Sequence, residues 1–264
     1  MLKITDIRKT FNHGTLDEKV ALDGVSLTLN DGDFVTIIGG NGAGKSTLMN
    51  AISGTLSVDA GSIELDGQDI TSLPEHKRAK FLGRVFQDPM FGTAGNMMIE
   101  ENMALAARRG QPRGLRWGIH KEEREAYKAS LATLGLGLEN RLSAKVGLLS
   151  GGQRQALTLL MASLRKPSLL LLDEHTAALD PKTAAKVLEI TDQIVNENHL
   201  TTMMITHNMR DAIAHGNRLI MMDAGRIVVD VSGEEKQKLT VSDLLSMFSK
   251  ASGSNEVDDK LVLS

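Results

Sequence analysis

The chain has 264 residues, a length that fits one or two domains. Hydrophobic residues make up 41% and charged residues 24%, which is a globular composition with enough apolar material for a core. The formal net charge of -3 and the aromatic content of 3% argue against a nucleic-acid-binding surface. The absence of cysteine excludes disulfides, thiolate metal sites and a cysteine nucleophile.

The N-terminus and the apolar runs predict a protein that is soluble and cytoplasmic. The longest unbroken apolar run, Met103–Ala107, has five residues. A helix that spans a bilayer needs about 20. The N-terminal segment carries charges where a secretory signal would need an apolar stretch.

Residues 1–35 alternate between apolar and polar side chains, as in Ile4–Ile7 and Val25–Leu29. Such alternation is typical of strands with one buried face. Gly61–Gly67 predicts a further short strand between two turns. We expect these segments to form an antiparallel sheet beside the core.

Four apolar runs are too short for helices and end in turn residues. They are Val35–Ile38, Leu169–Leu172, Met203–Ile205 and Leu219–Met222. Short runs without alternation predict strands buried on both faces, as in parallel sheets. A 3.6-residue apolar period over residues 181–198, with Pro181 at the first helical position, predicts a helix. Strands that alternate with helices indicate an α/β fold.

Residues from about 90 to 150 favour Ala, Leu, Glu, Lys and Arg, which predicts a helical insertion. A basic stretch lies within it, made of Arg108, Arg109, Arg113 and Arg116. We expect residues 2–248 to form a single domain that contains this insertion. Residues 249–264 are expected to form a flexible C-terminal tail.

A glycine-rich loop carries the strongest chemical signal in the chain. Gly39–Ser46 fits the pattern G-x-x-x-x-G-K-[ST] and lies between a predicted strand and a predicted helix that ends at Gly54. In such a loop the backbone N–H groups surround phosphate oxygens, the lysine reaches the β- and γ-phosphates, and the hydroxyl holds Mg²⁺. The loop therefore predicts binding of a nucleoside triphosphate, with Lys45 on the phosphates and Ser46 on Mg²⁺.

Two carboxylates, Asp173 and Glu174, follow the apolar run that ends at Leu172. Ligands bind at the carboxyl ends of strands in open α/β sheets, and neighbouring residues of a strand point to opposite faces. We therefore give the two carboxylates different roles. Asp173 would bind the metal through its water shell, and Glu174 would orient the attacking water. A helix cap or a solvated turn is the alternative interpretation.

Leu149–Gln153, with the sequence LSGGQ, begins a predicted helix with Ser150 as its N-cap and two glycines directly behind it. Glycine is a costly start for a helix, but exposed N–H groups there suit close approach to a phosphate. With this segment the chain resembles the ATPase subunits of ATP-binding-cassette (ABC) transporters. The resemblance covers roughly residues 2–230, and its motifs occur in the family's order.

The resemblance implies a P-loop NTPase (RecA-like) core with an antiparallel β subdomain and a helical subdomain. It also implies a role for each residue that matches a family motif. The catalytic residues would be Glu174, His207 and Gln87. The residues that contact ATP would be Phe11, Gly39, Gly40, Asn41, Gly42, Ala43, Gly44, Lys45, Ser46, Thr47, Ser150, Gly151, Gly152, Gln153 and Asp180. The Mg²⁺ ion would be held by Ser46, Gln87 and Asp173.

Some of these positions also have a purely structural interpretation, and two depart from the family pattern. Asp180 is a good helix N-cap whatever its other role, and Phe11 could be a core residue. Gly40 stands where the family usually has proline or serine. His175 follows Glu174 where proline is usual, and we expect it to be a solvated turn residue. A ring that lies near the γ-phosphate is the alternative.

The resemblance also implies partners and a direction of transport. One chain carries one phosphate loop and one LSGGQ segment, so two chains should enclose two ATP molecules as a homodimer. The motor would act at the cytoplasmic face of the membrane with permease subunits, docked on the helical insertion near Met90 and Phe91, and with an extracytoplasmic solute-binding protein. We favour import, with an amino acid as the suggested solute. The alternatives are an exporter motor, a non-transport ABC ATPase and an unrelated P-loop kinase, which would leave Leu149–Gln153 without a role.

Overall fold

The computed structural model describes residues 1–111 and 118–252. The chain folds as two compact units. The first contains Met1–Arg78 together with the chain from His199 onward, and the second contains Ala79–Asn198. The second unit is therefore larger than the helical insertion expected over residues 90–150, because two strands and two further helices belong to it.

The first unit contains the expected antiparallel sheet, with strand order β2-β1-β4-β5. Its strands are β1 (Leu2–Phe11), β2 (Lys19–Leu29), β4 (Ala60–Leu65) and β5 (Gln68–Asp69). The alternation of β1 buries Leu2, Ile4 and Ile7 on one face. The register shifts between Ile4 and Ile7, where Asp6 has a φ of 45°, so one extra residue is accommodated without exposing Ile7.

A second set of strands in the first unit includes three of the four strands that the apolar runs predicted. Its strands are β3 (Phe34–Ile38), β8 (Thr202–Ile205), β9 (Arg218–Asp223) and β10 (Arg226–Ser232). Strand β3 lies between β8 and β9 and is parallel to both, and β10 is antiparallel to β9. Every residue of β3 and β8 is buried, as expected for strands covered on both faces.

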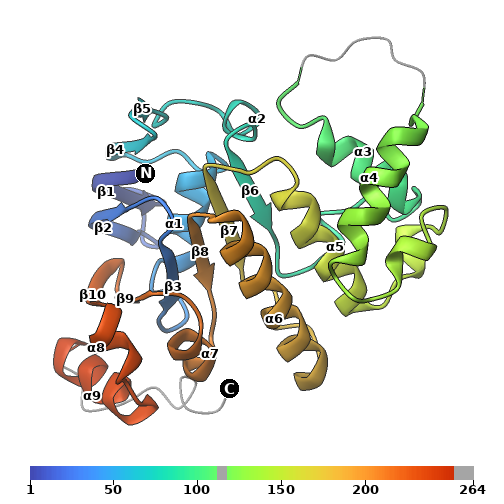
Figure 1. The fold of residues 1–264 in the computed structure, drawn as a ribbon. Helices are drawn as coiled ribbons and strands as arrows, with labels where there is room; N and C mark the ends of the chain where they lie inside the picture. The colour runs from blue at the N-terminus through green and yellow to red at the C-terminus, as the bar shows by residue number, and fades with distance from the viewer. Residues whose placement is uncertain (112–117, 253–264) are drawn as a thin grey trace. The chain divides into compact units, whose positions relative to one another are not determined.

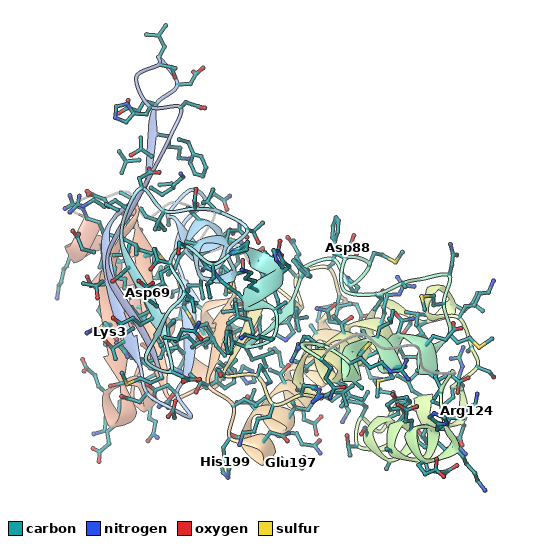
Figure 2. All side chains as sticks on the ribbon, turned by 90° about the horizontal axis from the view of Figure 1, so that it is seen from above. Lys3, Asp69, Asp88, Arg124, Glu197 and His199 are labelled. Carbon is teal, nitrogen blue, oxygen red and sulfur yellow. The ribbon has the colours of Figure 1, made fainter. Side chains whose placement is uncertain are left out.

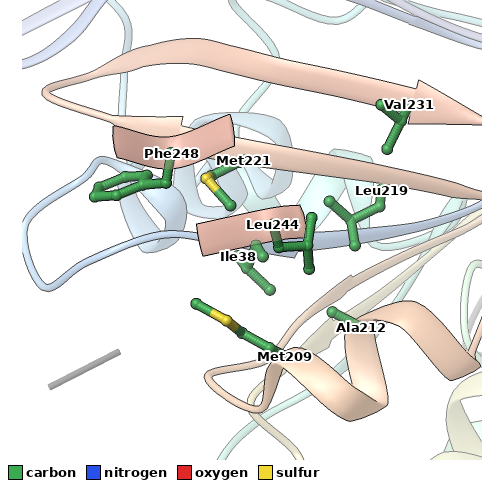
Figure 3. Packing of buried hydrophobic residues seen from close by; sticks show 8 residues of the cluster. All are labelled: Ile38, Met209, Ala212, Leu219, Met221, Val231, Leu244 and Phe248. Carbon is green, nitrogen blue, oxygen red and sulfur yellow. The ribbon is translucent and has the colours of Figure 1, made fainter. Parts of the chain in front are cut away.

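Figure 1 shows the helices of the first unit. They are α1 (Lys45–Ser53), α2 (Glu75–Arg78), α7 (Met209–Ala214), α8 (Gly233–Gln237) and α9 (Val241–Ser252). Figure 3 shows Leu244 and Phe248 of α9 packed in one cluster with Met209 and Met221. Residues 249–252, which were expected to belong to the tail, complete α9. The rest of that segment lies outside the described residues.

The second unit combines two parallel strands with helices. Its elements are β6 (Leu82–Val85), β7 (Leu169–Asp173), α3 (Ile99–Ala107), α4 (Lys121–Ala132), α5 (Gly151–Ser163), α6 (Pro181–Asn198) and the 3₁₀ turns Leu138–Asn140 and Val146–Leu148. Helices α3 and α4 and the two 3₁₀ turns lie within the range 90–150 for which a helical insertion was expected. Helix α6 has the bounds that its periodicity predicted. Within residues 1–111 and 118–252 no helix is long and apolar enough to cross a membrane.

The basic stretch of the helical region does not form a free cationic face where it is described. Arg108 donates to the carbonyl oxygen of Gly118 and pairs with Glu123 at 3.3 Å. Arg109 donates to the carbonyl oxygen of Ala162, and burial lowers the pKa of its guanidinium. Both side chains therefore serve the packing of this unit. Arg113 and Arg116 lie outside the described residues.

A buried arginine closes the C-terminal end of α1, the helix that follows the glycine-rich loop. Arg78 is 2% exposed and donates to the carbonyl oxygens of Ala51, Ile52, Leu73 and Thr71 at 2.7–2.8 Å. The carbonyls at a helix end have no partners within the helix, and a cation also complements the helix dipole there. Burial lowers the pKa of this guanidinium, and the four acceptors compensate for its lost hydration.

Replacing Arg78 by methionine should lower the free energy of unfolding by about 3 kcal/mol, because four carbonyl oxygens each lose a hydrogen bond in a buried place. Urea denaturation of the full chain measures this change. Lys77→Met, at the exposed neighbouring position of α2, is the matched control and should stay within about 0.5 kcal/mol of wild type. Equal stability of the two variants would contradict the capping role.

Candidate functional site

The glycine-rich loop leaves the buried strand β3 and leads directly into α1, and its backbone packs tightly against two other segments. A Cβ atom on Gly39 would lie 2.2 Å from the carbonyl oxygen of Met222, and one on Gly44 would lie 2.6 Å from that of Ala21. Both glycines also have positive φ, +151° and +101°. Only glycine fits these two positions, and backbone N–H groups in a glycine-rich loop before a helix are suited to binding phosphate.

Gly40 differs from its neighbours, because a Cβ atom there would meet nothing within 4 Å. The departure from the family pattern at this position is therefore sterically neutral.

Lys45, the first residue of α1, is 5% exposed and donates from Nζ to the carbonyl oxygens of Gly39 and Gly40 at 2.6 and 3.1 Å. Its ammonium group lies inside the loop, where it can bind a phosphate. Asn41, Gly42 and Ser46 are exposed, and Thr47 is half-buried.

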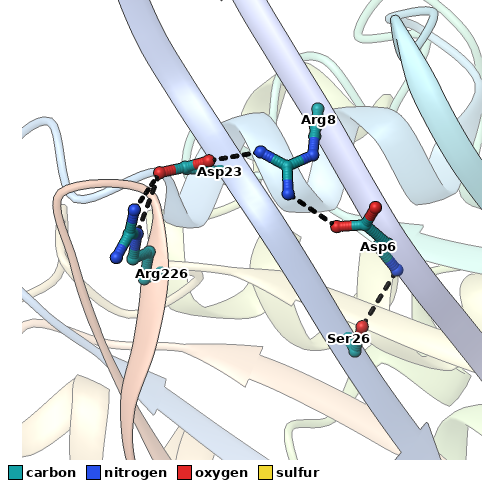
Figure 4. Close-up of polar contacts among 5 residues, drawn as sticks. All are labelled: Asp6, Arg8, Asp23, Ser26 and Arg226. Atoms are coloured by element: carbon teal, nitrogen blue, oxygen red, sulfur yellow. Dashed lines mark hydrogen bonds and ion pairs between the residues drawn. The ribbon is translucent and has the colours of Figure 1, made fainter.

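The turn between β9 and β10 is hydrogen-bonded to the glycine-rich loop. The N–H of Gly225 donates to the carbonyl oxygen of Ala43 at 3.0 Å, and the N–H of Asp23 donates to the carbonyl oxygen of Gly225 at 2.9 Å. Figure 4 shows that Arg226 and Arg8 both bind the carboxylate of Asp23, at 2.9 and 2.7 Å. The hydrogen bond from Arg226 is the main reason that the pKa of Asp23 is below its usual value. Sequence reasoning missed this support because its partners are far apart in the chain.

Phe11 and His207, two more of the predicted site residues, belong to the first unit. Phe11 ends β1 and is 37% exposed, on the hairpin that projects as a narrow arm in Figure 2. His207 follows β8, where Ile205 pairs with Ile37 of β3, so His207 and Gly39 come after the same ends of neighbouring parallel strands. The structure thus brings His207 to the edge of the sheet from which the phosphate loop begins.

Lys19 is a residue of this region that sequence reasoning missed. It begins β2 and pairs with Phe11, and its Nζ lies 3.2 Å from the place of a Cβ on Gly42. The side chain therefore brings a second lysine charge to the phosphate loop. No motif marks this position, and only the register of the β1–β2 hairpin reveals it.

In the second unit, β7 ends at Asp173 and places the carboxylate pair directly after a fully buried run. Asp173 Oδ2 lies 3.5 Å from Arg84 Nη2 on the neighbouring strand β6. Glu174 has a φ of 46°, a left-handed conformation that residues with a side chain rarely adopt. The backbone therefore changes direction at Glu174, directly after Asp173.

The expectation for His175 is wrong in its main form. The side chain is 2% exposed and its Nε2 lies 3.0 Å from the hydroxyl of Thr191 on α6, so it is not a solvated turn residue. The residues of the turn itself do not predict that His175 is buried, because its partner Thr191 lies on a helix farther along the chain.

The LSGGQ segment forms the predicted helix start. Ser150 caps α5: its hydroxyl accepts from the N–H of Gln153 at 3.3 Å, and the Gln153 side chain accepts from the N–H of Ser150. Glycine suits positions 151 and 152 for different reasons. A Cβ on Gly152 would lie 2.2 Å from the Thr183 side chain, so packing on α6 requires glycine there. A Cβ on Gly151 would meet only a side chain at 3.2 Å, and this exposed position suits approach of a ligand.

Asp180 and Gln87 complete the predicted set. Asp180 caps α6 by accepting from the N–H of Thr183 at 3.1 Å, and the hydrogen bonds from Thr183 hold its pKa below the usual value. Gln87 is exposed on the loop after β6. The amide of Gln155, a buried residue of α5, donates to the carbonyl oxygen of Phe86 at 3.1 Å. The loop that carries Gln87 is thereby tied to the helix that begins after Ser150.

A phosphate loop between a buried strand and a helix, together with paired carboxylates after another buried strand, is the arrangement of a P-loop NTPase. A family model described as ABC transporter matches residues 22–177. The chain belongs to this family: it is an ATP-binding ABC subunit with ATPase activity.

Relatives in sequence and structure agree with this assignment. The chain is 45% identical over 251 residues to a tyrosine transport ATP-binding protein of Clostridioides difficile, a match that covers 95% of this chain and 100% of that protein. It is 37% identical to the methionine import ATP-binding protein MetN of Rhizobium johnstonii, covering 86% of this chain but 60% of MetN. A solved dimeric ATP-binding cassette in a post-hydrolysis state, bound to ADP and Pi, is 29% identical with a TM-score of 0.74, covering 88% and 98% of the two chains.

Gly44→Ala should lower the affinity for ATP at least about tenfold, because a left-handed backbone and a carbonyl 2.6 Å away leave no room for a methyl group. Gly40→Ala, four residues earlier in the same loop, is the matched control and should bind ATP like wild type. Titration with a fluorescent ATP analogue, together with thermal unfolding of both variants, measures the difference. Wild-type affinity in a folded Gly44→Ala protein would show that the loop does not bind nucleotide in this conformation.

Proposed function

We propose that this chain is the ATP-hydrolysing motor of an importer that takes up an amino acid through separate membrane subunits. The observation that carries the proposal is the similarity to a tyrosine transport ATP-binding protein over the full length of that protein. The methionine import relative supports the same direction of transport and the same class of solute. The motor would act at the cytoplasmic face of the membrane, with an extracytoplasmic solute-binding protein as a further partner and no nucleic acid.

Oxygen ligands in this chain fit a Mg²⁺ ion that accompanies ATP. Mg²⁺ prefers oxygen donors and is usually held by one or two protein groups, the substrate phosphates and water. The hydroxyl of Ser46, the carboxylate of Asp173 and the amide oxygen of Gln87 are donors of this kind. No cluster of three or more His, Cys, Asp or Glu side chains suited to a metal occurs in the described ranges. When bound, Mg²⁺ would neutralise phosphate charge.

The residues of the chain would divide the reaction between binding and catalysis. Lys45 and the backbone N–H groups of Gly39–Ser46 would hold the phosphates, and Phe11 would stack on the adenine. Glu174 would accept a hydrogen bond from the attacking water and orient it toward the γ-phosphorus, where a P–O bond forms as the bond to the β-phosphate oxygen breaks. His207 would contact the γ-phosphate.

A homodimer would complete each nucleotide site. One chain supplies one phosphate loop and one LSGGQ segment, and Ser150 and Gly151 present an exposed helix start that suits a phosphate. In the proposed dimer this helix start would face ATP bound by the second chain, with Asp180 at the same contact. The similar cassette that was solved with ADP and Pi is dimeric, which supports this arrangement.

A groove in the second unit, lined by both apolar and polar side chains, would receive a short cytoplasmic helix of the permease. The groove has a volume of about 420 Å³ and is lined by Phe91, Leu105 and Met161, among others. Phe91 is 78% and Leu105 57% exposed, a large apolar surface for a chain on its own. Met90 lies beside it, 48% exposed, with its sulfur 2.8 Å from Arg154 of α5. A permease helix seated here would contact α5 close to the LSGGQ segment.

Glu174→Gln should bind ATP like wild type but hydrolyse it at least about a hundredfold more slowly, because the amide keeps the size of the side chain and loses its basicity. Steady-state phosphate release and ATP-analogue binding separate the two effects. The ATP-bound variant should also run as a dimer on a sizing column with Mg²⁺.

Glu189→Gln, at an exposed position of α6, is the control and should keep normal turnover. Unchanged turnover in Glu174→Gln would remove Glu174 from the reaction. A monomer in the presence of ATP and Mg²⁺ would contradict the proposed sandwich.

A further inference from the structure

The turn that follows β7 begins at Glu174, the second of the paired carboxylates, whose backbone is left-handed. The N–H of Ala177 donates to the carbonyl oxygen of Glu174 at 3.0 Å, so Glu174–Ala177 forms a tight turn with His175 at its second position. Glu174 itself has a φ of 46°. A non-glycine residue keeps a left-handed backbone only where the surroundings hold it there. Something around this turn must therefore fix it.

The His175 side chain is the anchor that the structure shows. Its Nε2 lies 3.0 Å from Thr191 Oγ1, and both residues are at most 2% exposed. The Thr191 hydroxyl donates its single hydrogen to the carbonyl oxygen of Val187 at 2.8 Å. The threonine oxygen must then be the acceptor of the other bond, so the histidine carries its proton on Nε2.

We propose that the hydrogen bond between His175 and Thr191 positions Glu174 for its work on the attacking water. The proposal rests on the proposed function, because it takes Glu174 as the group that orients this water. His175 and Thr191 are positioning residues: neither needs to touch ATP. The bond connects the second residue of the turn to the middle of α6, a helix of 18 residues that cannot easily follow a movement of the turn.

The position of His175 in the turn explains why an anchor is needed. Proline is favoured at the second position of a tight turn, because its ring fixes φ before folding. The imidazole ring of histidine does not include the backbone nitrogen, so it does not fix φ in this way. A buried hydrogen bond from its side chain to α6 supplies the missing restraint, and it places that restraint one residue from Glu174.

Thr191→Val tests this directly, because valine keeps the shape of threonine and removes the accepting oxygen. The turnover rate should fall about ten- to a hundredfold, since a displacement near 1 Å at a reacting group can cost that much. The KM for ATP should change less than about twofold, because the nucleotide is held by other residues. Thr191→Ser restores the hydroxyl and should restore turnover.

A second buried threonine supplies the matched control. Thr158 of α5 is 3% exposed and donates to the carbonyl oxygen of Arg154, four residues back, in the same way as Thr191. Thr158→Val should therefore carry the same general cost of removing a helix hydroxyl and leave turnover of the isolated chain unchanged. Thermal unfolding of each variant shows whether it is folded.

The outcomes separate this inference from the proposed function. Wild-type turnover in a folded Thr191→Val protein overturns the inference. Turnover that is as low in Thr191→Ser as in Thr191→Val overturns it too. If Thr191→Val does not fold, His175→Gln and His175→Leu decide, because only glutamine keeps a donor for Thr191; equal loss in both overturns the inference. Wild-type turnover in Glu174→Gln would instead overturn the proposed role of Glu174, whatever Thr191 does.

Discussion

The nucleotide-binding part of this protein depends on direct backbone contact between the phosphate loop and the strands beside it. At Gly39 and Gly44 the carbonyl oxygens of Met222 and Ala21 leave no space for one more carbon atom. The loop is therefore shaped by its neighbours, and Lys45 lies within it. A cradle whose backbone is held by its surroundings loses less entropy when it binds phosphate.

Much of the fold could be predicted from residue patterns, because those patterns report local burial. The continuous apolar runs predicted β3, β7, β8 and β9, and the alternating segments predicted β1 and β2. Pro181 and the apolar period gave the bounds of α6, and Ser150 was correctly assigned as the cap of α5. The phosphate loop and the LSGGQ segment were recognisable because each needs particular residue types at fixed spacing.

The interactions that could not be predicted join residues that are distant in the chain. Arg78 caps a helix that ends 25 residues earlier, and Arg226 binds Asp23 across about two hundred positions. No short pattern marks such pairs, since each partner alone is an ordinary polar residue. His175 is the clearest case: the sequence near it suggested a solvated turn, and only the fold brings Thr191 to its ring. These contacts hold the segments that carry the chemistry.

Uptake of labelled tyrosine by intact cells tests most directly the proposed function, in which ATP hydrolysis by this chain drives inward transport of an amino acid. Cells that lack the chain should lose most of the initial uptake, and expression of the wild-type chain should restore it. The relative named for tyrosine transport makes tyrosine the first solute to measure. Unchanged uptake of tyrosine and of other amino acids, or greater accumulation of label in cells without the chain, would contradict the importer assignment.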